Sequence, residues 1–180
     1  RLATEHLIEL GHRQIAAIPP TSELLNGYWR YTTWKNVLLE HDLTPGPAFT
    51  GDYSIRSGYE AAHRIVDTGE PFTAILVGTD NMALGAMHAL RERGLRIPDD
   101  VSIVGFDNTE FAMYLEPPLT TIDFQFAKQD EMAVRYLVEL IANPDMELHQ
   151  RVLLPDLIVR ESARPPIKHG PALAPSGHAN

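Results

Sequence analysis

The sequence has no cysteine and no long apolar run, and each absence excludes a class of protein. Without cysteine, neither disulfides nor thiolate metal sites can form. No apolar stretch approaches the roughly 18 residues of a membrane span, and no charged-then-apolar leader opens the chain. We therefore expect no membrane partner and a reducing, cytoplasmic setting.

Positive charge is scarce as well. The chain has 15 lysines and arginines against 24 aspartates and glutamates, which gives a formal net charge of -9. A surface this acidic repels phosphate, so the chain by itself should not bind nucleic acid. It also begins at Arg1 without a methionine, inside a helical pattern, and we expect it to be a fragment of a longer protein.

The sequence does contain a regular alternation of short apolar runs and amphipathic segments. With 180 residues, of which 44% are hydrophobic, it can build one compact core. The patterns predict strands at 15–18, 48–53, 72–77 and 101–106, and helices at 2–10, around 34–38, 59–69 and 83–94. Apolar strands separated by helices are typical of a parallel sheet covered on both faces. The predicted fold class is α/β, doubly wound.

This rhythm changes after Asp107. Pro117-Pro118 interrupts the chain, and residues 119–122 resemble an extended crossing segment. A helix with Ala133, Leu137, Leu140 and Ile141 on one face ends at Asn143-Pro144, and 151–160 favours one last strand or two. The proline-rich end has few large apolar side chains. We therefore divide the chain into one domain, 1–162, and a flexible tail, 163–180.

Polar side chains follow each of the four predicted strands, in the segments 20–22, 52–54, 79–81 and 107–109. In open α/β sheets, ligands bind beyond the carboxyl ends of the strands. Arg30, near the first turn of the second helix, belongs to the same edge. A guanidinium, the Asp107 carboxylate and the Tyr53 ring suit a polyhydroxylated or heterocyclic small molecule.

Simpler roles are open for several of these residues. Asp80 can be an N-cap, and Ser54 or Ser57 can cap the helix predicted at 59–69. Thr79 can be a strand-end residue, Tyr53 can pack its ring, and Arg30 can form a solvated ion pair. Asp107 has no predicted helix close behind it, which favours a ligand role.

Four stretches in order resemble the LacI/GalR family of bacterial regulators. They are ATEHLIELGHR (3–13), GTDNMALGA (78–86), GLRIPDDVSIVGFD (94–107) and PPLTTI (117–122), within a match over roughly 1–162. The resemblance implies a periplasmic-binding-protein-like fold. It corresponds to the carboxyl-terminal lobe plus the 123–150 segment, whose helix normally belongs to the amino-terminal lobe. The helix-turn-helix headpiece would then lie outside this chain, and operator DNA would be bound only through it.

The resemblance also implies roles for individual residues. Arg30 and Asp107 match effector-binding positions, Tyr53 stands where the family has a stacking aromatic residue, Thr79 where some members have asparagine, and Phe124 where a polar cleft residue occurs. The implied homodimer surface contains Met82, Leu84, Phe111 and Met113. For Met82 and Leu84, core packing is the alternative.

The predicted function is therefore the effector-sensing and dimerisation part of a repressor that binds a sugar or related metabolite. The alternative is a periplasmic or extracellular sugar-binding protein of a transport system. An enzyme is a weaker third reading, because no nucleophile elbow, Walker loop or Gly-x-Gly-x-x-Gly occurs. The histidines lack metal-ligand spacing, and we expect neither a metal nor a cofactor.

Overall fold

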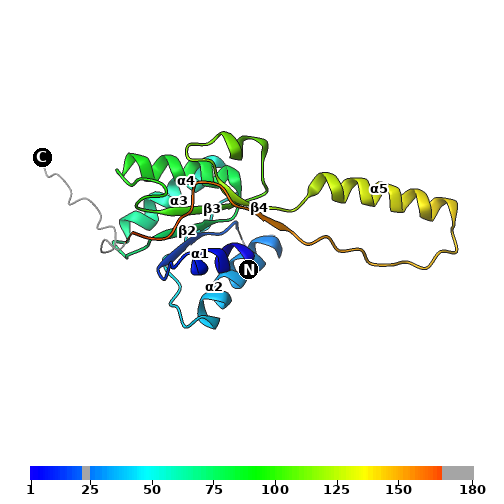
Figure 1. The fold of residues 1–180 in the computed structure, drawn as a ribbon, viewed down its shortest axis with the longest axis horizontal. Coiled ribbons are helices and arrows are strands. Elements are labelled where there is room, and N and C mark those ends of the chain that lie inside the picture. The colour runs from blue at the N-terminus through cyan, green and yellow to red at the C-terminus, as the bar shows by residue number, and fades with distance from the viewer. Residues whose placement is uncertain (22–24, 168–180) are drawn as a thin grey trace, which may run out of the picture.

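One five-stranded sheet organises the chain. The computed structural model describes residues 1–21 and 25–167. Its strands are β1 (Ile15–Ile18), β2 (Ala74–Val77), β3 (Ser102–Phe106), β4 (Thr120–Asp123) and β5 (Asp156–Ile158), in the spatial order β1-β2-β3-β4-β5 (Figure 1). Neighbours from β1 to β4 pair in parallel, whereas β5 is antiparallel to β4. The α/β prediction is confirmed, and β5 makes the sheet mixed.

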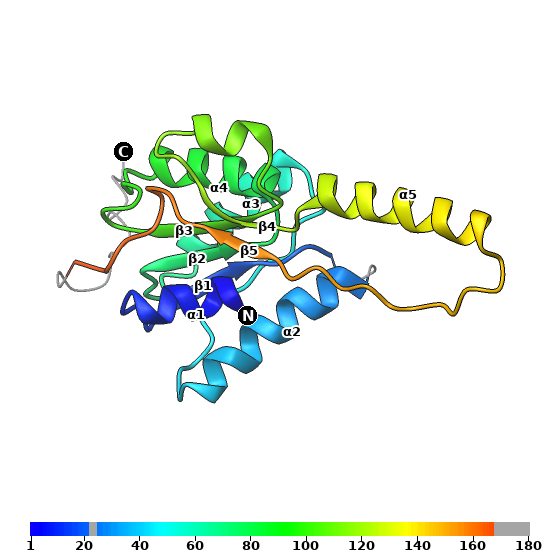
Figure 2. The ribbon, with the colours of Figure 1, turned by 45° about the vertical axis from the view of Figure 1, so that its right-hand side comes forward.

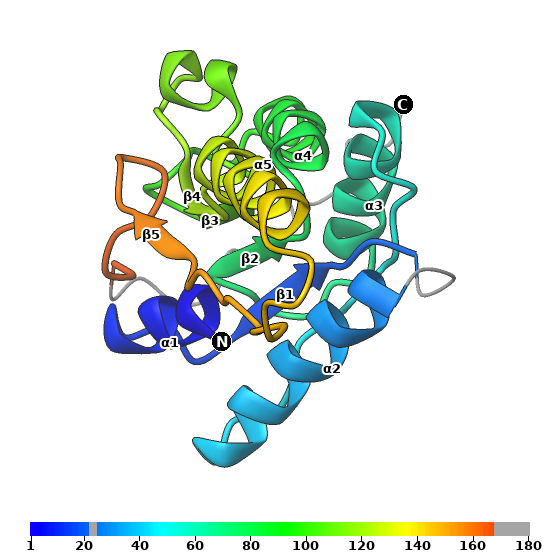
Figure 3. The same cartoon turned by 90° about the vertical axis from the view of Figure 1, so that its right-hand side faces the viewer.

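Helices cover both faces of this sheet, as Figure 3 shows. On one face lie α1 (Leu2–Glu9) and α2 (Leu25–Glu40), and on the other lie α3 (Ile55–Asp67) and α4 (Asp80–Glu92). Successive strand residues alternate between the two cores: Ile15 and Ala17 face the α1/α2 side, while Ala16 and Ile18 face the α3/α4 side. This double burial explains why the strands are continuously apolar.

The helices α3 and α4 both begin at the carboxyl edge of the sheet. The cap of α3 is the predicted one, whereas the cap of α4 is not. Ser54 caps α3 by accepting a hydrogen bond from the Ser57 N–H, as predicted. For α4 the cap is Thr79, whose side chain accepts from the Met82 N–H. The prediction that Asp80 is the cap is wrong, because Asp80 is already the first helical residue.

The strand expected at 48–53 does not form. Only two isolated parallel bridges join this segment to the β1 side, Ala48 with Ala17 and Gly51 with Pro20. Pro19 and Pro20 follow β1 directly and have no N–H to donate, so a regular ladder cannot continue past Ile18. The segment therefore runs beside β1 as an irregular edge.

A long arm leaves the body at β4 and returns at β5. It consists of α5 (Phe126–Ala142) and the return segment 143–155, and it projects away from the sheet (Figures 1 and 2). No residue of α5 is buried. The short 3-10 helix η1 (Glu110–Tyr114) lies between β3 and β4 in the chain. None of the helices in the described ranges is long and apolar enough to cross a membrane.

The first residues of the predicted tail, Ala163 and Arg164, contact the body. The backbone of Arg164 is held against the body, because its carbonyl accepts from the His12 ring at 2.9 Å and it exchanges hydrogen bonds with the Ser102 hydroxyl. Ala163 packs on the α1/α2 core. Residues 168–180, and Ser22 at the first strand exit, lie outside the described residues.

Candidate functional site

The structure brings Arg30 and Asp107 together at the carboxyl edge of the sheet. Arg30 belongs to α2, and its guanidinium donates to the carbonyl of Gly78, just after β2. A second guanidinium nitrogen lies 3.8 Å from the Asp107 Oδ1, just after β3. The two side chains remain 20% and 27% exposed, so both can be reached from solvent.

Two phenylalanine rings form the wall beside Arg30. The guanidinium carbon lies 4.8 Å from the Phe106 ring centroid and 5.5 Å from that of Phe124. The two rings are stacked, with their centroids 6.0 Å apart. A cation packed against two aromatic rings is fixed in place without losing all its N–H donors to the protein. Phe124 was predicted at this site, whereas Phe106 was missed.

The Asp107 carboxyl has an unusual electrostatic environment. Burial raises its pKa to about 6, a shift that Arg30 opposes and the nearby Asp80 carboxylate reinforces. Within residues 1–21 and 25–167, no hydrogen bond is donated to this carboxylate, and Arg30 is its ion-pair partner. Its acceptor positions are therefore open. Its backbone φ of 108° is also uncommon for a residue with a side chain. Residues with such strained backbone conformations cluster at functional sites.

The other two predicted effector residues are Tyr53 and Thr79. Tyr53 is half-buried beside the end of β1, has a φ of 72°, and its buried hydroxyl has no hydrogen-bond partner among the described residues. Thr79 is 5% exposed, and its hydroxyl already caps α4. The effector roles of Tyr53 and Thr79 thus remain predictions.

An apolar cavity of about 260 Å³ adjoins the Arg30 site. Arg30, Phe106 and Phe124 belong to its wall, together with Trp29 and Trp34 from α2. The edge therefore combines charged groups on one side with a largely apolar hollow on the other. Such a combination is common in sites for small molecules.

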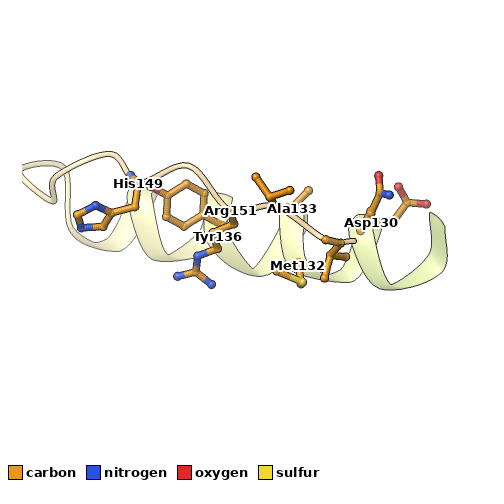
Figure 4. Close-up of a pocket in the computed structure, with 9 residues that line it drawn as sticks. Asp130, Met132, Ala133, Tyr136, His149 and Arg151 are labelled. Carbon is orange, nitrogen blue, oxygen red and sulfur yellow. Dashed lines mark hydrogen bonds between the residues drawn. The ribbon is translucent and has the colours of Figure 1, made fainter. Parts of the chain in front are cut away.

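A larger cavity of about 550 Å³ lies in the arm, away from this edge. Figure 4 shows its wall, with Asp130 and Tyr136 on α5 and with His149 and Arg151 on the return segment. The Tyr136 hydroxyl accepts from the His149 N–H at 2.8 Å, and Arg151 lies over the Tyr136 ring at 4.8 Å. These contacts hold the two halves of the arm together. In the part of the chain described, no cluster of acidic or histidine side chains could hold a metal.

Of the four residues predicted at the dimer interface, one is buried, two are half-buried and one is exposed. Met82 is 0% exposed and packs in the α3/α4 core, so it offers nothing to a partner and we leave it out of the proposed interface. Leu84 and Phe111 are half-buried, and Met113 is 52% exposed. Tyr114, which the sequence reasoning missed, is 72% exposed at the end of η1.

Comparisons with known proteins agree with this fold. A family model described as "Periplasmic binding protein-like domain" matches residues 4–163. The HTH-type transcriptional repressor PurR of Haemophilus influenzae (strain PittEE) is 36% identical over 168 residues, which is 91% of this chain and 50% of the relative. The Lactose operon repressor of Escherichia coli (strain K12) is 37% identical over 160 residues, 89% of this chain and 44% of the relative.

A solved structure gives the same result. The dimeric Lac repressor with an 11-residue C-terminal deletion matches with a TM-score of 0.87 and 34% sequence identity, covering 92% of this chain and 61% of that chain. The matched class is thus the periplasmic-binding-protein-like α/β domain. The chain belongs to this family and, within it, to the effector-binding domains of LacI/GalR-type repressors. It spans about half the length of the curated relatives it matches.

Proposed function

We propose that this chain is the effector-sensing and dimerisation part of a bacterial repressor, and that its effector is a sugar or a related polyhydroxylated metabolite. The observation that supports this most directly is the Arg30–Asp107 pair at the sheet edge. An ionised carboxylate with open acceptor positions suits hydroxyl donors, while the guanidinium suits acceptors. The aromatic wall of Phe106 and Phe124 suits the apolar face of a ring.

Control of transcription would then run through the rest of the protein. In this proposal the arm completes a second lobe, and operator DNA is bound by a helix-turn-helix headpiece outside these 180 residues. Effector binding would favour one arrangement of the lobes over another and so change operator affinity. The net charge of -9 fits a part that does not itself touch DNA. The protein would act in the cytoplasm.

The dimer would form through the outer face that contains Leu84, Phe111 and Met113, to which the structure adds Tyr114. An exposed apolar patch of this kind suits an isologous contact between two copies. The transport alternative has less support, because the relatives reported above are named as repressors. Their names also point away from an enzyme.

The experiment has two steps. Mass spectrometry of the purified full-length protein identifies any small molecule that it retains, and calorimetry on that protein then measures the affinity of the molecule for the Arg30→Ala and Asp107→Asn variants. Each variant loses charge-assisted hydrogen bonds worth about 1.5–3 kcal/mol, so we expect affinity to fall roughly 10- to 100-fold. Arg56→Ala is the control, because Arg56 is 87% exposed on α3. Unchanged affinity in both site variants would remove Arg30 and Asp107 from the effector site.

A further inference from the structure

Asp80 is a fully buried carboxylate whose role is not helix capping. It is 0% exposed, and Thr79 already caps α4. Its Oδ1 lies so close to β3 that a Cβ added at Gly105 would meet it at 2.5 Å. A buried carboxylate is stable only when hydrogen bonds replace its lost water, so its partners indicate what it does.

Those partners converge on the loop that contains Asp107. Asp80 accepts from the Thr109 N–H at 2.7 Å, from the Thr109 hydroxyl at 3.0 Å and from the Thr121 hydroxyl at 2.7 Å. The Thr121 oxygen in turn accepts from the Asn108 N–H at 3.4 Å. Although Thr109 precedes η1, its side chain makes no capping bond there. Asp80 thus holds the loop directly through Thr109 and indirectly through Thr121.

This loop needs an external restraint. Asp107 and Asn108 both have positive φ, 108° and 49°, which residues with side chains adopt at a cost. We propose that Asp80 is a positioning residue of the effector site, which fixes the 107–109 loop and thereby the place of the Asp107 carboxylate opposite Arg30. The claim that Asp107 binds an effector depends on the proposed function. The claim that Asp80 positions Asp107 does not.

The test follows the ionisation of Asp107 in the 180-residue chain by carbon NMR of labelled aspartate carboxyls between pH 4 and pH 8. The charged groups that face Asp107 are Arg30 from α2 and Asp80 from α4. Thr109→Val removes one hydrogen bond to Asp80 and changes no charge. A looser loop admits water, so we expect the titration midpoint of Asp107 to fall from about 6 toward 3.8, by about half a pH unit or more.

The matched control is Ser162→Ala. Ser162 is fully buried, as Asp80 is, and its hydroxyl donates to the Ile103 carbonyl and accepts from the Thr120 N–H without touching the 107–109 loop. An unchanged Asp107 midpoint in Thr109→Val, or an equal fall in Ser162→Ala, would overturn the proposal. Protonation of Asp80 over the same pH range would overturn it as well, because the lower midpoint of Asp107 would then reflect the lost charge of Asp80. The assay contains no effector, so its failure is separate from a failure of the proposed function.

Discussion

At the scale of single residues, Asp107 combines a half-buried carboxylate with a backbone φ of 108°. Both features cost folding free energy, and neither is offset by a hydrogen bond to the carboxylate from the described residues. The neighbouring Asp80 is also buried, and burial raises its pKa too, but hydrogen bonds from Thr121 and Thr109 oppose that shift. The two aspartates therefore differ in one respect: the acceptors of Asp80 are used within the fold, whereas those of Asp107 are open.

Replacing Asp107 should stabilise the protein at neutral pH. Its pKa is raised to about 6 in the folded state, so stability is highest when it is protonated and falls as pH rises through 6. Asp107→Asn removes the charge and tolerates positive φ, and should raise the free energy of unfolding by about 1–3 kcal/mol at pH 8. The gain should vanish near pH 3. Urea unfolding at both pH values measures it, with Asp130→Asn on the exposed arm as control. Equal stability of Asp107→Asn and the native chain at pH 8 would contradict the argument.

The sequence predicted Arg30 and Asp107 at one edge because strand ends in a parallel sheet are read directly from apolar runs. It did not predict the hydrogen bonds of Asp80, because an acidic residue before a helical stripe fits an N-cap equally well. The partners Thr109 and Thr121 lie 29 and 41 residues further along the chain. Only the folded sheet brings them within reach.

At the scale of elements, α1 and the start of β2 are tied to the segment after β5 by one buried ring. His12 is 1% exposed and lies just beyond α1. Its Nε2 is 2.9 Å from the Arg164 carbonyl, which can only accept, so Nε2 bears the proton and Nδ1 accepts from the Thr73 hydroxyl at 2.8 Å. The neutral ring therefore satisfies both neighbours.

This tie should make stability sensitive to acid. Burial lowers the pKa of His12 to about 4, so the unfolded chain binds the proton first as pH falls below about 6.5. The native chain should lose about 3 kcal/mol from this group between pH 7.5 and pH 4. His12→Gln should be less stable at pH 7.5 but should lose correspondingly less on acidification. Urea unfolding across this range checks it, and parallel pH curves for the two proteins would contradict it.

Elements with one dominant pattern were predicted well, and those that depend on distant partners were not. The helices α3 and α4 have clear apolar stripes and lie where expected. The 48–53 segment has the pattern of a strand, but the prolines after β1 cannot donate the hydrogen bonds that a regular ladder needs. The proline-rich stretch after Ser162 looked like a tail, yet His12 and Ser102 hold Arg164.

At the scale of the whole molecule, the arm leaves apolar side chains without a covering layer. On α5, Leu137 is 57% and Ile141 71% exposed, and on the return segment Val152 is 69% and Leu154 77% exposed. The arm projects from one end of the body (Figure 1), so these exposed apolar side chains lie away from the sheet and its helices. Surfaces of this kind associate with other protein surfaces in water.

The chain should consequently associate beyond the proposed dimer, and a change on the arm should stop this. The double variant Leu137→Lys, Ile141→Glu places two charges one helical turn apart on α5. Because α5 buries nothing, we expect the stability of the body to change by less than about 0.5 kcal/mol. Sedimentation velocity should show larger species for the native chain and none beyond a dimer for the variant. Leu39→Lys, at an exposed position on α2, is the control, and an identical distribution in native chain and double variant would contradict the prediction.

The antiparallel pairing of β4 with β5 has a mechanical consequence for how the arm can move. The two strands that join arm and body are paired in register at Thr121–Ile158, Ile122–Leu157 and Asp123–Asp156, and the Gln125 side chain donates a hydrogen bond to Asp156. Sliding β5 along β4 would break these pairs together, whereas a twist of the two segments beyond Asp123 and Asp156, where β3 no longer pairs with β4, breaks none of them. We therefore expect the arm to reorient against the sheet by twisting about this connection, because the β4–β5 pairs oppose sliding.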